Sequence, residues 1–178
     1  MQYRRANVKG GTYFFTVNLA ERHLRLLVDH VDALLAVVAR VKRAHPFHID
    51  AFAVLPDHLH AIWTLPEGDA DFAMRWMLIK AGFSRHLAQG ERRNASRVGK
   101  GERGIWQRRY WEHLIRDDVD YQRHVDYVHY NPVKHGYVVT CARATDWAYS
   151  SLHRHIRAGM ASPDWGVGVG NEGKYGER

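Results

Sequence analysis

The chain has 178 residues, of which 46% are hydrophobic, and carries a formal net charge of +7. This length and apolar content are typical of one folded domain with its own core, and they argue against a disordered chain. The single cysteine excludes an internal disulfide framework and a cysteine-based zinc site. No run of about 18 uncharged apolar residues is present, so we expect no membrane-spanning helix. The polar start of the sequence favours a cytoplasmic location.

The positive charge favours a polyanionic partner, because clustered Lys and Arg side chains release counterions when they bind phosphates. A basic surface without any partner would explain the same charge equally well. Charge alone therefore does not decide between these two interpretations.

The first half of the chain predicts a strand, a helix and a β-hairpin. Alternation of residue character predicts a strand at 13–19, and apolar residues at helical spacing predict a helix at 31–44. Two further strand-like segments, 47–55 and 58–65, flank Pro56-Asp57, which is a turn signal. These two strands should therefore pair as a hairpin.

The second half predicts a helix at 71–87, a mobile basic loop at 90–104 and a strand at 110–115. Asp117-Asp118 should cap a third helix. We expect that helix to end at Asn131-Pro132, because the residue before a proline disfavours helical geometry.

The order of these elements predicts an α+β fold of the ferredoxin-like β-α-β-β-α-β type. This fold has a four-stranded antiparallel sheet with two helices on one face. The additional helix after the last strand has to pack elsewhere, and the other face of the sheet is available. A short helix is expected near 150–157. We predict one domain, 1–165, followed by a glycine-rich and flexible tail, 166–178.

Two histidines stand on the same face of the third predicted strand. Side chains alternate along a strand, so Leu59 and Ala61 should face the two core helices while His58 and His60 face away from them. Two imidazoles at this spacing can reach one metal ion. Two half-exposed strand histidines without a metal are the alternative interpretation.

The third predicted helix presents Tyr127 and Asn131, with His124, on one face. If this helix covers the free face of the sheet, His58, His60 and Asn131 could bind one divalent cation, Mg²⁺ or Mn²⁺. Tyr127 would then lie beside the cation as a nucleophile for a phosphodiester. The alternative is that Tyr127 belongs to the core, as most helical aromatic residues do. No P-loop pattern is present, so no nucleotide cofactor is expected.

At this point the chain resembles a known family, the single-tyrosine HUH transposases, and in particular the REP-associated tyrosine transposases of bacteria. The resemblance runs from about residue 3 to residue 153. The matching segments are Tyr3-Arg4-Arg5 with Gly10-Gly11-Thr12-Tyr13-Phe14-Phe15-Thr16-Val17-Asn18, Leu55-Pro56-Asp57-His58-Leu59-His60 with Trp63-Thr64-Leu65-Pro66, Arg75-Trp76 with Ile79-Lys80, Ile105-Trp106-Gln107 with Trp111-Glu112-His113, and His124-Val125-Asp126-Tyr127 with Asn131-Pro132-Val133-Lys134.

The resemblance implies a role for each residue of the proposed site. His58 and His60 correspond to the metal-binding histidines, Tyr127 to the nucleophile and Asn131 to the third ligand, where related insertion-sequence transposases have Gln. The implied substrate is single-stranded DNA that carries REP hairpins, and cleavage leaves a 5′-phosphotyrosine and a free 3′-hydroxyl. A monomeric, nucleoid-associated bacterial protein is implied as well.

Basic side chains are candidates for phosphate contacts with such a hairpin. They are Arg4, Arg5, Lys9, Arg75, Lys80, Arg108, Arg109 and Lys134. Trp106 and Tyr110 could stack on bases or pack in the core. Two rival functions remain open, a non-catalytic protein that binds hairpin DNA or RNA on the same fold and a metallonuclease that uses water as its nucleophile.

Overall fold

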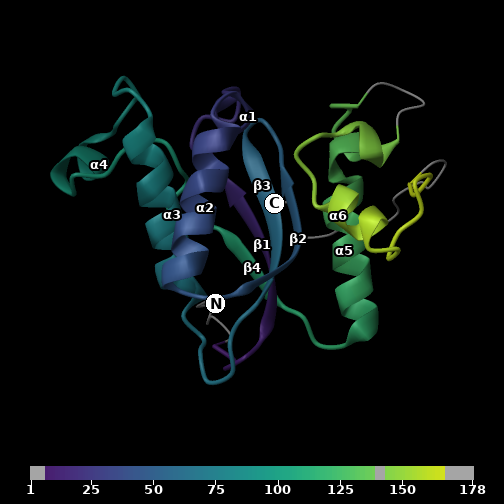
Figure 1. Cartoon of the computed structure of the whole chain (residues 1–178). Helices are drawn as coiled ribbons and strands as arrows, with labels where there is room; N and C mark the ends of the chain where they lie inside the picture. Colours follow the sequence, from purple (N-terminus) through teal and green to yellow (C-terminus); the bar gives the residue numbers. More distant parts are fainter. Residues whose placement is uncertain (1–6, 139–142, 167–178) are drawn as a thin grey trace, which may run out of the picture.

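A four-stranded antiparallel sheet forms the centre of the computed structural model, which describes residues 7–138 and 143–166 (Figure 1). Its strands are β1 (Thr12–Asn18), β2 (His48–Val54), β3 (His58–Thr64) and β4 (Trp111–Leu114), in the order β2-β3-β1-β4. Each neighbouring pair is antiparallel. The predicted α+β fold with its four-stranded sheet is confirmed. β1 and β3 are the two central strands, so their side chains are covered on both faces.

The first face of the sheet carries the main hydrophobic core. The helices α2 (Val31–Ala44) and α3 (Phe72–His86) pack on it, as does the short helix α1 (Leu26–Asp29), which the sequence pattern did not predict. The indole ring of Trp63 on β3 stacks on that of Trp76 on α3 at 4.1 Å between centroids. The residues that alternation assigned to this face of β3 are in this core, so the predicted orientation of the strand is confirmed.

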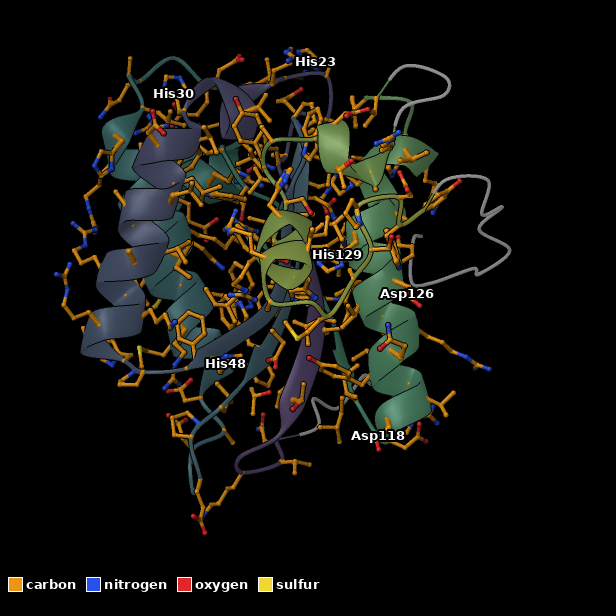
Figure 2. All side chains as sticks on the ribbon, turned by 45° about the vertical axis from the view of Figure 1, so that its right-hand side comes forward. His23, His30, His48, Asp118, Asp126 and His129 are labelled. Atoms are coloured by element: carbon orange, nitrogen blue, oxygen red, sulfur yellow. The ribbon has the colours of Figure 1, made fainter. Side chains whose placement is uncertain are left out.

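The second face is covered by α5 (Asp118–Lys134), the helix that follows the last strand. In Figure 1, α5 and α6 (Leu152–Arg157) lie on the side of the sheet opposite α2 and α3. Phe14 and Ile62 from the sheet pack against Val125 and Val128 of α5. A short 3-10 helix, Ala144–Asp146, precedes α6. Figure 2 shows the side chains that fill this second layer, with the buried His129 among them.

The end of α5 differs from the prediction. The helix continues through Pro132 to Lys134, so the expected stop at Asn131-Pro132 is wrong. Pro132 lies in the last turn, where its missing N–H removes one hydrogen bond only. The true stop is Gly136, whose φ of 67° is left-handed. Its N–H donates to the carbonyl oxygen of Val133 and the next N–H donates to that of Pro132, which is a Schellman cap.

The basic segment 90–104 also differs from the expected mobile loop. It contains a short helix, α4 (Ala95–Gly99), whose first turn is capped by the side chain of Asn94. The guanidinium of Arg103 pairs with Glu91 and donates to the carbonyl oxygen of Ser84 at 2.8 Å, which ties the segment to α3. Arg4, Arg5 and the tail from 167 lie outside the described residues. Within the described residues, no helix has the length and apolarity to cross a membrane.

Candidate metal and nucleophile site between β3 and α5

His58 and His60 lie side by side on the face of β3 that α5 covers. Their ring centroids are 5.0 Å apart. His58 is 2% exposed and His60 is fully buried, so the alternative of two half-exposed strand histidines does not describe them. The pair lies under α5, as the sequence pattern predicted for a helix packed on this face.

Asp57 determines which nitrogen of His58 faces the site. Oδ1 of Asp57 lies 2.7 Å from Nδ1 of His58, and the same carboxylate pairs with Arg22. Burial raises the pKa of Asp57, but the hydrogen bonds from His58 and Arg22 outweigh this effect and set the pKa at about 2. An ionised carboxylate only accepts hydrogen bonds, so Nδ1 of His58 carries the proton. Nε2 of His58 is buried and makes no hydrogen bond with any described residue.

Thr16 plays the corresponding part for His60. The two residues are directly opposite each other in the β1–β3 ladder, and Oγ1 of Thr16 lies 2.9 Å from Nδ1 of His60. When Nδ1–H donates to the hydroxyl, Nε2 of His60 keeps a lone pair for a ligand. Partners of this kind orient metal-binding histidines and fix their tautomer.

One stripe of α5 faces the histidine pair. Residues 127, 131 and 135 follow one another at four-residue spacing and therefore share one side of the helix. The ring of Tyr127 lies 5.1 Å from that of His60, and the ring of His135 lies 5.1 Å from that of His58. Asn131 stands between these two contacts on the same side of the helix.

Asn131 is fully buried, and its amide atoms Oδ1 and Nδ2 make no hydrogen bond with any described residue. A buried polar group without a partner costs about 1–3 kcal/mol. Such a cost is common where the group serves a ligand. Together with Nε2 of His58, this amide supplies donor atoms that fit a divalent cation of the Mn²⁺ or Mg²⁺ class.

Tyr127 is 1% exposed and belongs to the cluster that joins α5 to the sheet. Phe14 meets its ring edge-on at 5.7 Å between centroids. Nζ of Lys134 lies 5.1 Å from the same ring centroid. Tyr127 shares this cluster with Val125 and Val128, so it is buried as the core alternative expected. The tyrosine is therefore adjacent to the histidine pair and buried at the same time.

A second group of ligand-type side chains lies at the start of α5. Within the described residues, His113, Asp120 and His124 offer ligand atoms that all lie within 4.8 Å of one another, so this group could hold a metal ion. The ring of Phe14 contacts His124 at 4.8 Å and His60 at 5.6 Å between centroids. This phenylalanine contacts both groups, and they remain two distinct sets of ligands.

The predicted phosphate-binding residues do not share one surface. Lys9, Arg108, Arg109 and Lys134 are exposed. Lys80 and Arg108 line a groove of about 660 Å³ that borders α3, whereas Lys134 lies beside Tyr127.

Arg75 and Trp106 are both buried and hydrogen-bonded to backbone carbonyl oxygens. Arg75 is 2% exposed and its guanidinium donates to Asp69 at 2.6 Å and to the carbonyl oxygens of His45, Pro46 and Asp71. Because this guanidinium is buried and hydrogen-bonded within the protein, it is not accessible to a DNA phosphate. Trp106 is 5% exposed, and its indole N–H donates to the carbonyl oxygen of Lys80. Of the two expected roles, stacking on bases or packing in the core, the structure shows packing in the core.

Sequence reasoning missed the residues that support the histidine pair. Asp57 was interpreted as part of a turn, although its position next to His58 is a signal for a carboxylate partner. Thr16 and His135 carried no such signal, because their positions depend on strand register and on the true end of α5.

Comparison with known proteins identifies relatives of the chain. No family model matches the chain. It is 46% identical over 164 residues to the REP-associated tyrosine transposase of Escherichia coli (strain K12), covering 92% of this chain and 90% of that protein. The "Putative REP-associated tyrosine transposase" of Haemophilus influenzae is 45% identical over 165 residues, covering 92% of each. A solved structure of a REP-associated tyrosine transposase bound to a REP hairpin is 44% identical, with a TM-score of 0.83, and the match covers 100% of this chain and 98% of that one. The chain therefore belongs to the REP-associated tyrosine transposases, a family of DNA-processing enzymes.

Proposed function

We propose that this protein is a metal-dependent endonuclease and strand transferase for single-stranded DNA with REP-type hairpins, and that it works through a covalent 5′-phosphotyrosine. One observation carries the proposal. His60 of β3, which lies beside His58, contacts Tyr127 of α5, and Asn131 lies on the same helical stripe as Tyr127. The related transposase that was solved with a REP hairpin supports the same class of partner.

His58, His60 and Asn131 would hold the cation, which we infer to be Mg²⁺ or Mn²⁺. When bound, the cation polarises the scissile phosphodiester and neutralises charge that develops during the reaction. Asp57 and Thr16 keep the imidazoles in the orientation that binding requires. The buried amide of Asn131 gains in this way the partner that it otherwise lacks.

Tyr127 supplies the nucleophile. Its phenolic oxygen forms a bond to phosphorus while the bond from phosphorus to the 3′-oxygen breaks. The phenol proton passes to solvent, and the 3′-oxygen takes up a proton to leave as a hydroxyl. The reverse reaction joins the strand to the same or another 3′-hydroxyl, and no nucleotide is needed because the phosphotyrosine conserves the bond energy.

Lys134 places a positive charge beside the nucleophile, with Nζ 5.1 Å from the ring of Tyr127. A cation at this position favours the approach of a phosphate. Tyr127 is 1% exposed, so the surrounding side chains have to move for the scissile phosphate to reach its hydroxyl.

A single chain provides all four residues of the site, and we infer that a monomer is sufficient for the reaction. We also infer that the protein acts in the cytoplasm at the nucleoid, where such DNA is found. Light scattering of the protein with and without hairpin DNA tests the oligomeric state. A requirement for a dimer in cleavage would contradict this part of the proposal.

The test uses end-labelled single-stranded REP hairpins from the source genome with Mn²⁺ or Mg²⁺. The wild-type protein should cleave them, and EDTA, His58→Ala or His60→Ala should abolish cleavage. Tyr127→Phe should bind the hairpin and leave it intact, whereas the control Tyr130→Phe on the same helix should cleave normally. Cleavage by Tyr127→Phe would favour the metallonuclease that uses water. Binding without cleavage by the wild-type protein would favour the non-catalytic hairpin-binding protein.

A further inference from the structure

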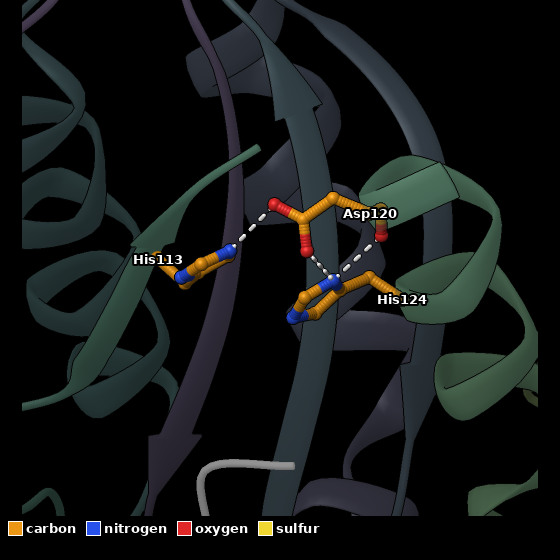
Figure 3. A group of neighbouring side chains, drawn as sticks. All are labelled: His113, Asp120 and His124. Carbon is orange, nitrogen blue, oxygen red and sulfur yellow. Dashed lines mark hydrogen bonds and ion pairs between the residues drawn. The ribbon is translucent and has the colours of Figure 1, made fainter. Parts of the chain in front are cut away.

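We infer that His113, Asp120 and His124 form a second metal site, which takes a Zn²⁺-class transition-metal ion and fastens β4 to the first turn of α5. The three residues face one another across the gap between the strand and the helix (Figure 3). This inference is independent of the proposed function, because it shares no ligand with the site of His58, His60 and Asn131.

Asp120 lies between the two imidazoles. Its Oδ2 is 2.8 Å from Nε2 of His113, and its Oδ1 is 3.1 Å from Nδ1 of His124. Zinc ligands lie about 2.0–2.2 Å from the ion, which puts tetrahedral ligand atoms roughly 3.3–3.5 Å from one another. The three ligand atoms already lie within 4.8 Å of one another, so small side-chain rotations are enough to bring them around one ion.

The imidazole rings of His113 and His124 are stacked, with centroids 4.7 Å apart and an interplanar angle of 16°. Nε2 of His113 faces Oδ2 of Asp120, whereas Nδ1 of His124 donates to the backbone carbonyl oxygen of Asp120 at 2.8 Å and also lies 3.1 Å from Oδ1. Both rings have to turn toward a common point before an ion can replace these contacts. His113 is at the surface, with 28% of its side chain exposed, so it has room to turn and the ion has a path from solvent.

Asp120 is held in place before any ion arrives. Its backbone N–H donates to Oδ1 of Asp117 at 2.8 Å, and its carboxylate accepts the backbone N–H of Arg116 at 3.1 Å. Burial raises the pKa of Asp120, but hydrogen bonds from His113 and from the Arg116 N–H set it at about 2, so the carboxylate is ionised at neutral pH. An anchored anionic ligand lowers the entropy cost of assembling the site.

The donor set selects the type of ion. Two imidazole nitrogens and one carboxylate oxygen suit Zn²⁺, which would take water as its fourth ligand. The donor types resemble those of His58, His60 and Asn131, but the oxygen ligand here is a carboxylate instead of a neutral amide, so this site offers a divalent cation an additional negative charge.

The experiment measures metal binding on the full chain after removal of metals by EDTA and dialysis. The double variant His58→Ala/His60→Ala removes two ligands of the proposed catalytic site and leaves the second group intact. Co²⁺ replaces Zn²⁺ as a spectroscopic probe, because a tetrahedral cobalt site absorbs visible light. We expect one Co²⁺ per chain, displaced by Zn²⁺. At Zn²⁺ about 100 times above Kd, the melting temperature should rise by roughly 5 °C or more.

His113→Phe in this background keeps a stacked ring against His124 and removes a ligand. Its affinity for Co²⁺ should fall by more than the roughly 100-fold loss that outer-shell changes cause. His113→Cys should restore binding and add a sulfur-to-cobalt charge-transfer band in the near ultraviolet. The spectrum of the parent chain, which also contains Cys141, is subtracted as background. His48→Phe is the matched control, because His48 is an exposed histidine 3.1 Å from Asp50, and it should change nothing.

Two results would overturn the inference. If the double variant binds no Co²⁺, the three residues form a hydrogen-bonded group only. If His113→Phe binds Co²⁺ as tightly as its parent, the ion is held elsewhere. Neither result would alter hairpin cleavage, which tests the proposed function separately.

Discussion

Nδ1 of His58 lies 2.7 Å from Oδ1 of Asp57, its neighbour in the sequence, and this bond directs the other imidazole nitrogen toward α5. Asp57 is held in turn by Arg22. A carboxylate in this position orients a metal-binding imidazole and makes it a stronger ligand.

Asp57→Ala should therefore weaken metal binding without touching a ligand. We expect the affinity for Mn²⁺ to fall by about 10–100-fold, because His58 can then rotate and change tautomer. Isothermal titration calorimetry measures this change, with the exposed Asp32→Ala as a control that should bind like the wild type. An unchanged affinity in Asp57→Ala would mean that the cation does not depend on His58.

Arg75→Met should reduce stability and not DNA affinity. Removal of the buried guanidinium leaves three carbonyl oxygens without their donor, at a cost of about 3 kcal/mol in the free energy of unfolding. Urea unfolding and hairpin binding, both measured where the variant is folded, separate the two effects. The exposed Arg109→Ala should show unchanged stability. Normal stability with weakened binding in Arg75→Met would restore Arg75 as a phosphate contact.

His129 should make the protein less stable in acid. Burial lowers the pKa of His129 to about 3, and the charges of His155 and Arg154 act in the same direction. An unfolded histidine has a pKa near 6.5, so between these two values the unfolded chain binds a proton that the folded chain does not. The free energy of unfolding should therefore fall as pH falls from 6.5 toward 3, by up to about 1.4 kcal/mol per pH unit.

Urea unfolding of the wild type and of His129→Gln between pH 7 and pH 4 measures this contribution. The variant should lose the part of the acid dependence that His129 causes, while its amide can still bond to Ser151, which lies 2.9 Å from Nε2 of the histidine. Parallel curves for the two proteins would show that His129 is not the titrating group.

Gly136→Ala should destabilise the end of α5. At a φ of 67°, a Cβ atom costs about 1–2 kcal/mol, and the Schellman cap loses its favourable geometry. Gly99→Ala is the matched control, because an added Cβ there meets no atom within 4 Å and alanine is the better helix former. Thermal unfolding should show a lower melting temperature for the first variant and an equal or higher one for the second. The reverse order would contradict the assigned helix end.

The sequence predicted the layers of the fold well, because hydrophobic periodicity encodes them directly. Alternation along β3 predicted which face carries His58 and His60. The structure confirms this alternation, because Leu59 and Ala61 on the opposite face lie in the main core. Helix ends were less accurate. Asn131-Pro132 suggested a stop, but the stop depends on the backbone of Gly136, and a proline in a last turn is tolerated.

The environment of the site required the structure. The pairing of Thr16 with His60 depends on the register of β1 and β3, which alternation alone does not determine. The burial of Tyr127 depends on how closely α5 packs on Phe14, and no sequence pattern reports that distance. Arg75 was expected at the surface because arginine usually is, and its buried hydrogen bonds override that tendency.

Detection of the covalent bond between Tyr127 and the cleaved strand tests the phosphotyrosine mechanism. The protein is incubated with a REP-hairpin oligonucleotide and Mn²⁺, digested with a protease and analysed by mass spectrometry. We expect a peptide that carries the 5′-phosphate end of the cleaved strand on Tyr127, and no such peptide from Tyr127→Phe. Cleaved DNA with no protein adduct, or an adduct on another residue such as Tyr121 or Tyr130, would contradict it.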